Sequence, residues 1–393
     1  MQKRQLFLQH VAQTSPFPLA IEIVQSEGMY LYDEHGKAHL DLIAGIGVSA
    51  LGHRHPAVTE AVKAQLDRYL HTLVYGEFIL SPQVELASLM AEHLPDPLDS
   101  VYFVNSGSEA TEGAMKLAKR FTGRGEIIAA RLAYHGSTQG AASLMEPTTF
   151  TQPFYPLLPG IRHIDFNCWQ CLEQITERTA AVILETVQAE WGVRRPAPGY
   201  LKAVKARCEE VGALLILDEI QAGYGRTGSL WAFTQYNVVP DILLLAKGMG
   251  GGMPIGAFVA AREVMSTLSH DPLLGHITTF GGHPVCCAAG LATLQTLLAE
   301  PYIEEVQQKA QRFKDQLVHP QIRDVRNAGL LMAVELSDFA AVQKVIQYAL
   351  QHGVITDWFL FNDRSLRIAP PLIISEEEID QAVAIILAGM DQL

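Results

Sequence analysis

Two short apolar runs that each end at a charged residue constrain this chain most. Residues 214–217 precede Asp218, and residues 242–246 precede Lys247 and a glycine-rich loop. Apolar runs of this length are typical of strands that are buried in a parallel sheet. Parallel strands present their carboxyl ends at one edge of the sheet, where ligands bind in open α/β folds. The sequence therefore predicts an acid and an amine close together at a ligand site.

Further candidate strands and helices alternate along the chain. The candidate strands are residues 101–104, 126–131, 180–185, 214–217 and 241–246. Helix-sized intervals separate the last three, and this alternation predicts an α/β fold with a mostly parallel central sheet. Alternating apolar positions in residues 18–45 predict a small antiparallel sheet. The pattern of helices and strands after about residue 290 predicts a second, smaller α/β unit.

These changes of pattern also suggest domain boundaries. We expect residues 51–295 to form a large domain around the central sheet and residues 296–393 to form a small C-terminal domain. We expect residues 1–50 to be an N-terminal segment that packs with the small domain.

Two local signals mark the starts of helices. Ser375 and Glu378 have the spacing of a capping box, in which each side chain bonds to the other residue's backbone N–H. Ser81 and Pro82 have the order of an N-cap followed by a first-turn proline. Both patterns predict a helix immediately after them.

Charge and hydropathy exclude several classes of partner. The formal net charge is −13, and no basic run occurs, which argues against nucleic acid or an anionic membrane as the main partner. No apolar run approaches the roughly 20 residues that span a bilayer. The first residues lack the apolar segment and cleavage site of a signal peptide. We therefore expect a cytoplasmic protein.

The cysteines do not predict a disulfide framework or a metal site. The chain has five cysteines, of which Cys168 and Cys171 form a CxxC pair. A zinc or redox role would need a second pair or histidines at metal spacing, and Cys208, Cys286 and Cys287 do not supply them. We expect no metal and only structural cysteines.

A serine- and glycine-rich turn follows the candidate strand at residues 101–104. Ser106, Gly107 and Ser108 lie where that strand breaks and a helix begins. A helix start leaves backbone N–H groups free and carries a positive dipole end, so it is a ready phosphate site. The alternative is a plain helix cap without a ligand.

The Asp218 and Lys247 pair has three interpretations. The first is structural, with Asp218 as a cap and Lys247 extending to solvent. The second is a dinucleotide site, because residues 223–228 fit GxGxxG. That fit is weak, since the motif begins five residues after Asp218, no clear helix follows it, and no acidic residue ends the next strand.

The third interpretation is a pyridoxal 5'-phosphate site. This cofactor needs an amine that condenses with its aldehyde and an acid that keeps its ring nitrogen protonated. A carboxylate about 4 Å from a pyridinium gains about 4 kcal/mol at an effective dielectric near 20, or roughly three pKa units. Lys247 and Asp218 supply both groups, and the glycines at 248 and 250–252 allow backbone to approach a flat ring closely.

At these residues the chain resembles a known family along almost its full length. LDEIQAGYGRTG followed by LLLAKGMGGGMPIGA is similar to the signature of the class III aminotransferases, the ω-amino-acid type that acts on substrates such as acetylornithine, ornithine and 4-aminobutyrate. LGHRHPAV, FVNSGSEATEGAMKLA, YHG, TTFGGHP and LRIAPPL resemble further blocks in the family's order. The resemblance implies the aspartate-aminotransferase fold, which is fold type I of the pyridoxal-phosphate enzymes, with the cofactor in the large domain.

The resemblance also implies roles for individual residues. Lys247 would form the internal aldimine and then carry the proton of the transfer, while Asp218 would pair with the ring nitrogen. Thr279 would reach the phosphate of the neighbouring subunit, which makes a homodimer the expected unit. The remaining implied cofactor contacts are Ser106, Gly107, Ser108, Tyr134, His135, Glu185 and Gln221.

For substrates, the resemblance implies a terminal or non-α amino donor and 2-oxoglutarate as acceptor. Arg367 matches the arginine that binds a substrate carboxylate, and Glu190 matches the glutamate that neutralises it. Two positions depart from the family. Ser137 replaces an arginine that binds the donor's carboxylate, and Ile46 replaces a tyrosine of ornithine-type members. Arg131, Arg194 and Arg195 are the candidate substitutes for the missing arginine.

Two alternatives remain open at this point. An aminomutase of the same fold would keep Lys247 and Asp218 but would need no external oxo acid. A binding protein without turnover would have no use for an activated amine, so the intact pair argues against it.

Overall fold

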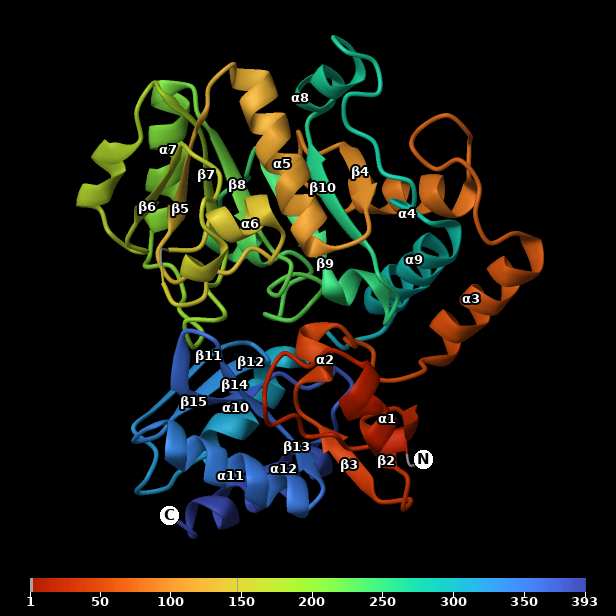
Figure 1. Ribbon diagram of the computed structural model, residues 1–393, viewed down its shortest axis with the longest axis vertical. Coiled ribbons are helices and arrows are strands. Elements are labelled where there is room, and N and C mark those ends of the chain that lie inside the picture. The colour runs from red at the N-terminus through yellow and green to blue at the C-terminus, as the bar shows by residue number, and fades with distance from the viewer. Residues whose placement is uncertain (1–2, 147) are drawn as a thin grey trace.

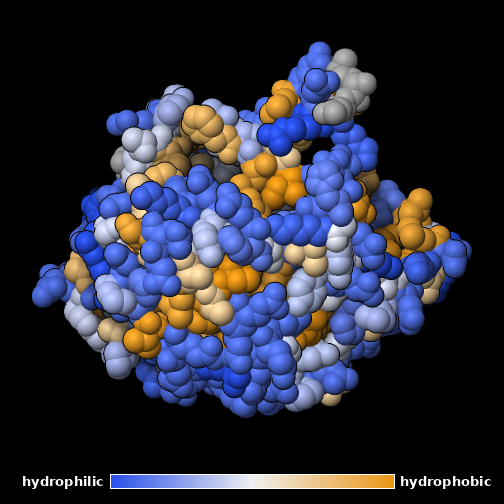
Figure 2. Space-filling model, turned by 90° about the horizontal axis from the view of Figure 1, so that it is seen from below, coloured by the Kyte–Doolittle hydropathy of each residue, from blue (hydrophilic) through white to orange (hydrophobic). Residues whose placement is uncertain are grey.

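The strands of this protein form three β-sheets within residues 3–146 and 148–393, the part of the chain that the computed structural model describes. Figure 1 shows the seven-stranded sheet in the upper part of the molecule and the strands of the two four-stranded sheets in the lower part, where both termini also lie. Seen from below, the surface is largely hydrophilic, with hydrophobic residues in separate patches (Figure 2).

The seven-stranded sheet has the order β4-β10-β9-β8-β7-β5-β6. The pairs β8–β9, β7–β8, β5–β7 and β5–β6 are parallel, and β10 runs antiparallel to its neighbours β9 and β4. The prediction of an α/β fold with a mostly parallel central sheet is therefore confirmed. The strands are β4 (Ser100–Val104), β5 (Glu126–Ala130), β6 (Ile161–Ile164), β7 (Thr179–Glu185), β8 (Leu214–Asp218), β9 (Ile242–Ala246) and β10 (Gly256–Ala260).

Both faces of this sheet are buried, which explains its continuous apolar runs. Alternate residues of β8 belong to different clusters: Leu215 and Leu217 pack on one side, and Leu214 and Ile216 on the other. The second cluster includes the apolar face of helix α5 (Gly107–Thr122), which lies across the sheet in Figure 1. The first cluster includes residues of α4 (Ser81–Glu92), α7 (Tyr200–Val211) and α9 (Pro284–Ala299), and α9 also packs against α3 (Pro56–Arg68).

The lower part joins the two ends of the chain. Strands β1 (Ile23–Glu27), β2 (Tyr30–Asp33) and β3 (Ala38–Asp41) form the predicted antiparallel meander, and β13 (Val354–Ile355) pairs with β3 in parallel. Residues near the N-terminus therefore share a sheet with residues near the C-terminus. The proposed domain limits at residues 50 and 295 stay a prediction, and residues 1–2 of the first segment lie outside the described residues.

The third sheet has the order β11-β12-β15-β14, with antiparallel neighbours. Its strands are β11 (Asp324–Ala328), β12 (Leu331–Glu335), β14 (Asp357–Phe359) and β15 (Asn362–Ile368), and the long helices of this region are α10 (Val306–Gln316), α11 (Phe339–Gln351) and α12 (Glu376–Met390). Ser375 and Glu378 form the predicted capping box at the start of α12.

Short elements complete the described chain. The helices are α1 (Lys3–His10), α2 (Ala44–Gly47), α6 (Gln139–Ser143) and α8 (Arg262–Met265), and the 3-10 turns are η1 (Gln152–Phe154), η2 (Gln170–Gln174), η3 (Ala232–Tyr236), η4 (Lys247–Gly250) and η5 (Ser266–Ser269). Among the described residues, none of the helices has the length and apolar character needed to cross a membrane.

One local expectation was wrong, and one contact was not foreseen. Ser81 is the first residue of α4 rather than its N-cap, because Leu80 occupies the cap position and no side chain caps the helix. Cys168 and Cys171 form a disulfide, which the sequence analysis did not predict. The Cα atoms of the two cysteines lie 5.3 Å apart, which is within the usual range for a disulfide.

Candidate active site

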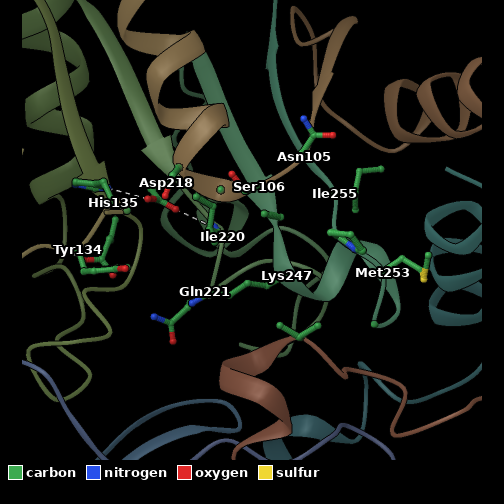
Figure 3. A pocket seen from close by; sticks show the side chains of 18 residues that line it. Asn105, Ser106, Tyr134, His135, Asp218, Ile220, Gln221, Lys247, Met253 and Ile255 are labelled. Atoms are coloured by element: carbon green, nitrogen blue, oxygen red, sulfur yellow. Dashed lines mark hydrogen bonds and ion pairs between the residues drawn. The ribbon is translucent and has the colours of Figure 1, made fainter. Parts of the chain in front are cut away.

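A cavity of about 420 Å³ lies beyond the carboxyl ends of β8 and β9, where ligands bind in such sheets. Its walls come from these strand ends, the start of α5, the segment after β5 and the loop between β9 and β10 (Figure 3). Asp218 and Lys247 both line it, as the order of the strands predicts. The other predicted residues that line it are Ser106, Gly107, Ser108, Tyr134, His135, Glu185 and Gln221.

Asp218 is the last residue of β8 and is held by two hydrogen bonds. Its Oδ1 accepts the backbone N–H of Ile220 at 2.9 Å, and its Oδ2 contacts His135 Nδ1 at 2.7 Å. Because a carboxylate only accepts, the Nδ1 of His135 carries the hydrogen. His135 is in turn fixed by Thr111 of α5, whose hydroxyl donates to the His135 carbonyl at 2.9 Å. Asp218 is therefore a buried, oriented carboxylate.

Glu185 lies beside Asp218, at the end of the neighbouring strand β7 and in register with it. Its Oε1 accepts the Tyr134 N–H at 3.1 Å and its Oε2 accepts the Ala189 N–H at 2.9 Å. Burial, together with the nearby Asp218 charge, raises the pKa of Glu185 to about 7. Glu185 thus fixes the backbone at Tyr134 and Ala189 on either side of the cavity.

Lys247 follows β9 directly and begins the turn η4 with a left-handed backbone, φ 47°. A lysine rarely adopts this conformation, so the surrounding glycine-rich fold must hold it there. Its amine makes no hydrogen bond or ion pair with any other residue in 3–146 or 148–393. Burial lowers the pKa of this amine to about 8, and the charges of Glu190 and Arg367 act on it in opposite directions. The amine therefore reaches its neutral, nucleophilic form at a lower pH than an ordinary lysine does.

The start of α5 has the features of a phosphate cradle. Ser106 is the N-cap, and its hydroxyl accepts the Glu109 N–H at 3.2 Å. Ser108 Oγ accepts the Ser137 N–H at 3.2 Å. A Cβ at Gly136, where φ is 131°, would lie 2.2 Å from Ser108 Oγ, so only glycine lets the two segments approach this closely. The N-terminal end of a 16-residue helix thus opens into the cavity.

Arg367 and Glu190 form a buried pair. Arg367 Nη1 and Nη2 donate to Glu190 Oε1 and Oε2 at 3.0 and 2.9 Å, which is a bidentate arrangement. Gln221 also donates to Glu190 Oε1, at 3.0 Å, and so connects the pair to the cavity. Burial alone would raise the pKa of Glu190, but the Arg367 charge and the hydrogen bonds from Leu360 and Arg367 together outweigh it, so the net pKa lies below its ordinary value.

Asp357 is a third member of this cluster that the sequence analysis missed. Its Oδ1 lies 3.0 Å from Arg367 Nε, within ion-pair distance but without the alignment of a hydrogen bond. Burial raises the pKa of Asp357 to about 6, partly offset by Arg367. Arg367 also stacks over the ring of Phe359 at 4.5 Å. No local motif marks Asp357, which meets Arg367 only through the pairing of β14 with β15.

Three other predicted residues, Tyr134, Ile46 and Thr279, differ in their position relative to the cavity. Tyr134 lines the cavity, and its hydroxyl bonds to Ser137 Oγ at 2.8 Å. Ile46 lies in α2 with a left-handed backbone, and Val48 lines the cavity two residues later. Thr279 is exposed and does not line the cavity of its own chain.

The three candidate substitute arginines are also elsewhere. Arg131 pairs with Glu146 at 2.6 Å and with Asp165 at 3.3 Å. Arg194 and Arg195 line a separate cavity. Within the described residues, none of the three lines the site.

The residues present fit pyridoxal 5'-phosphate. The Lys247 amine forms no hydrogen bond or ion pair in the part of the chain that is described. The Asp218 carboxylate is buried and is oriented by His135, and Ser106, Gly107 and Ser108 at the start of α5 line the cavity. These features supply the amine, the acid and the phosphate site that the cofactor requires.

Comparisons with known proteins agree with this site. The aminotransferase class-III family model matches residues 11–389. An acetylornithine aminotransferase of Methanopyrus kandleri is 41% identical over 380 residues, which cover 95% of each protein. The crystal structure of ornithine aminotransferase from Toxoplasma gondii superposes with a TM-score of 0.92 at 31% identity and covers 100% of this chain and 96% of that chain.

A second structure of the Toxoplasma gondii enzyme superposes with a TM-score of 0.91 at 31% identity and covers 99% of this chain and 93% of that chain. It contains pyridoxal phosphate at partial occupancy in its active site. The chain therefore belongs to the class-III aminotransferase family and is a pyridoxal-phosphate-dependent aminotransferase.

Proposed function

We propose that this enzyme transfers a terminal or non-α amino group from an amine or amino-acid donor to 2-oxoglutarate. The observation that carries the proposal is the bidentate pair of Glu190 and Arg367 beside the Lys247 cavity. The two Nη groups of Arg367 now bind the Glu190 carboxylate. They can bind a substrate carboxylate in the same geometry once Glu190 moves away.

The pair allows one site to accept two kinds of substrate. With Glu190 bound, the Arg367 charge is neutralised, and a donor end without a carboxylate can lie next to it. With Glu190 displaced, Arg367 can bind the carboxylate of an oxo acid. Asp357 lies 3.0 Å from Arg367 Nε, so it would hold the orientation of the guanidinium while the Nη atoms change partner.

The protein residues would have the following roles. Pyridoxal phosphate, when bound, supplies an aldehyde that exchanges amines and a ring that stabilises negative charge. Lys247 Nζ would attach it covalently and carry the proton of the transfer. Asp218 would hold a proton at the ring nitrogen, and Gln221 would lie near the phenolic oxygen.

The other walls of the site would hold the cofactor in place. Ser106, Gly107 and Ser108 would bind the phosphate through N–H and hydroxyl groups. Tyr134 would cover the ring face and exclude water from it.

The donor is the less determined substrate. The relatives named above are an acetylornithine and an ornithine aminotransferase, which favours an ω-amino acid donor. Ser137 is neutral and bonds to Tyr134, so the position offers no cation to a donor carboxylate, which favours a diamine. Acetylornithine, ornithine and a diamine are therefore the donors to compare first.

We also propose a homodimer in which Thr279 reaches the neighbouring site, and a cytoplasmic location. Thr279 is exposed and lies between the exposed apolar residues Ile277 and Phe280, a composition that suits a subunit contact.

The proposal is tested by the two half-reactions followed separately. The cofactor-loaded enzyme is mixed with one donor at a time, without oxo acid, and the visible absorption of the cofactor is recorded. We expect a productive donor to bleach this absorption, and 2-oxoglutarate to restore it while forming glutamate. No bleaching by any primary amine would contradict the proposal. Recovery of the absorption with a rearranged donor and without any oxo acid would favour the aminomutase.

A further inference from the structure

A second cavity, of about 660 Å³, lies outside the active site. One wall is the segment that carries Trp191, Arg194 and Arg195, and the facing wall includes Arg326 of β11. No acidic side chain lines this cavity in the described part of the chain. Three arginines without an acid are unusual in a protein whose net charge is −13.

Arg326 has internal partners for its charge. Its Nη1 donates to Asp324 Oδ2 at 2.7 Å and to Glu335 Oε2 at 2.6 Å, and its Nε donates to the Gly192 carbonyl at 2.8 Å. Arg326 therefore acts as a fixed wall of the cavity and is not free to bind a ligand strongly.

Arg194 and Arg195 differ from Arg326 in this respect. Within residues 3–146 and 148–393, neither forms an ion pair, and the buried Nε of Arg194 has no acceptor. Burial, followed by the neighbouring Arg326 charge, lowers the pKa of Arg194, and the charges of Glu335 and Asp324 offset this only in part. Its guanidinium is held 5.1 Å from the ring centroid of Trp191. An anion in the cavity would offset the repulsion between the Arg194 and Arg326 guanidinium groups.

We propose that this cavity is a second binding site, in which Arg194 and Arg195 bind a small oxyanion. The guanidinium fork matches the geometry of phosphate and carboxylate groups, and it is weakly hydrated, which lowers the cost of leaving water. Both chemistries place two or more oxygens on one centre, so either a phosphate or a carboxylate compound fits the arginines.

The position of this site connects it to the active site. Gln188 and Arg194 form a backbone bridge with N–O distances of 2.9 and 2.8 Å, which closes a short hairpin. Glu190 lies in the turn of that hairpin and bonds to Arg367, whereas Arg194 ends it and lines the second cavity. We therefore expect an oxyanion at Arg194 to change how readily Glu190 leaves Arg367, an effect that rests on the proposed function.

The binding test uses the cofactor-loaded enzyme, so that the cofactor already occupies the phosphate cradle at α5. Inorganic phosphate and citrate are titrated separately by calorimetry. We expect saturable binding of at least one of them, weakened at least tenfold by Arg194→Gln and by Arg195→Gln. Because Arg195 is exposed, its variant tests the site without disturbing the fold. The tighter of the two probes identifies the chemical source of the ligand.

Arg178→Gln is the matched control, because Arg178 is an exposed arginine away from this cavity. It should bind as the wild type does. No saturable binding of either probe, or equal affinity in the wild type and both cavity variants, would overturn the proposal. Binding that depends on Arg367 rather than on Arg194 would also overturn it, because the probe would then occupy the active site.

The link to Glu190 is measured kinetically. If the probe acts through the hairpin, the KM for the oxo acid should change with its concentration in the wild type and not in Arg194→Gln, while kcat changes less. An unchanged KM in an enzyme that still binds the probe at Arg194 would overturn the link. Failure of the aminotransferase reaction itself would show as loss of turnover without any probe, so the two failures are distinguishable.

Discussion

His135 and Asp218 are 83 residues apart in the chain and form a 2.7 Å hydrogen bond at the centre of the site. The contact joins the segment after β5 to the end of β8, and Thr111 ties the same histidine to α5. Three elements that would each hold part of the cofactor are therefore fixed relative to one another. The bond orients the Asp218 carboxylate.

We predict that His135→Ala weakens the binding of pyridoxal phosphate by about 10- to 100-fold. Hydrogen bonds to charged groups contribute about 1.5–3 kcal/mol, and each 1.4 kcal/mol is about tenfold in affinity. The variant leaves Asp218 with the Ile220 N–H as its remaining bond. Titration of the cofactor-free enzyme with the cofactor measures the change. His35→Ala, at an exposed histidine, is the control, and equal affinity in both variants would contradict the prediction.

Arg367 should act on the acceptor more than on a diamine donor. We expect Arg367→Ala to raise the KM for 2-oxoglutarate by about 10- to 100-fold, since a bidentate charged pair is lost, and to raise the KM for a diamine less. Steady-state kinetics with each substrate varied in turn measure both values. Arg364→Ala removes a half-exposed arginine from the same strand and should change neither. Equal increases for both substrates would remove the assigned role of Arg367.

The amine of Lys247 should control the pH dependence of cofactor attachment. Its pKa is lowered to about 8, and only the neutral amine attacks an aldehyde. The rate of attachment should therefore rise about tenfold per pH unit below pH 8 and level off above it. An unperturbed lysine would continue to gain rate to about pH 10.4. Stopped-flow absorbance of the cofactor-free enzyme, mixed with pyridoxal phosphate from pH 6 to 10, locates the plateau; a plateau near 10 would refute the burial effect.

Much of the central sheet follows from the sequence alone. The runs that became β8 and β9 are apolar throughout because both faces are buried, and Asp218 and Lys247 mark where each strand ends at the cavity. The capping box at Ser375 is equally local, since its two hydrogen bonds join residues three apart. Such features depend on neighbours in the chain, so a pattern of residue types is enough to find them.

The missed features depend on the tertiary fold. Asp357 contacts Arg367 only because β14 pairs with β15. Strand β10 was not among the predicted strands, and its antiparallel direction has no signature in the sequence, because an apolar run has the same composition in parallel and antiparallel pairing. Glu190 and Arg367 were found only through the family resemblance, since a buried charge pair has no local signature.

Glu219 should be one of the acidic residues that stabilise the fold most. It is buried, its Oε1 accepts the Thr186 hydroxyl at 2.9 Å and the Phe233 N–H at 2.5 Å, and its Oε2 accepts the Ala232 N–H at 2.7 Å. Removing the acceptor leaves these donors unsatisfied at about 1–3 kcal/mol each. We expect Glu219→Ala to lower the free energy of unfolding by at least ~3 kcal/mol in urea denaturation. Glu209→Ala, at an exposed carboxyl, should change it little.

The effect of Glu219 should also depend on pH, with a sign set by burial. Burial raises the pKa of Glu219 in the folded protein to about 7, so between about pH 4.5 and 7 the folded state keeps a proton that the unfolded state loses. The stabilisation from this group is therefore complete below pH 4.5 and declines as the pH rises to 7. The difference between wild type and Glu219→Ala should be larger at pH 5 than at pH 8. Urea denaturation at both values measures it, and a difference that grows with pH would mean that Glu219 is ionised in the folded protein throughout this range.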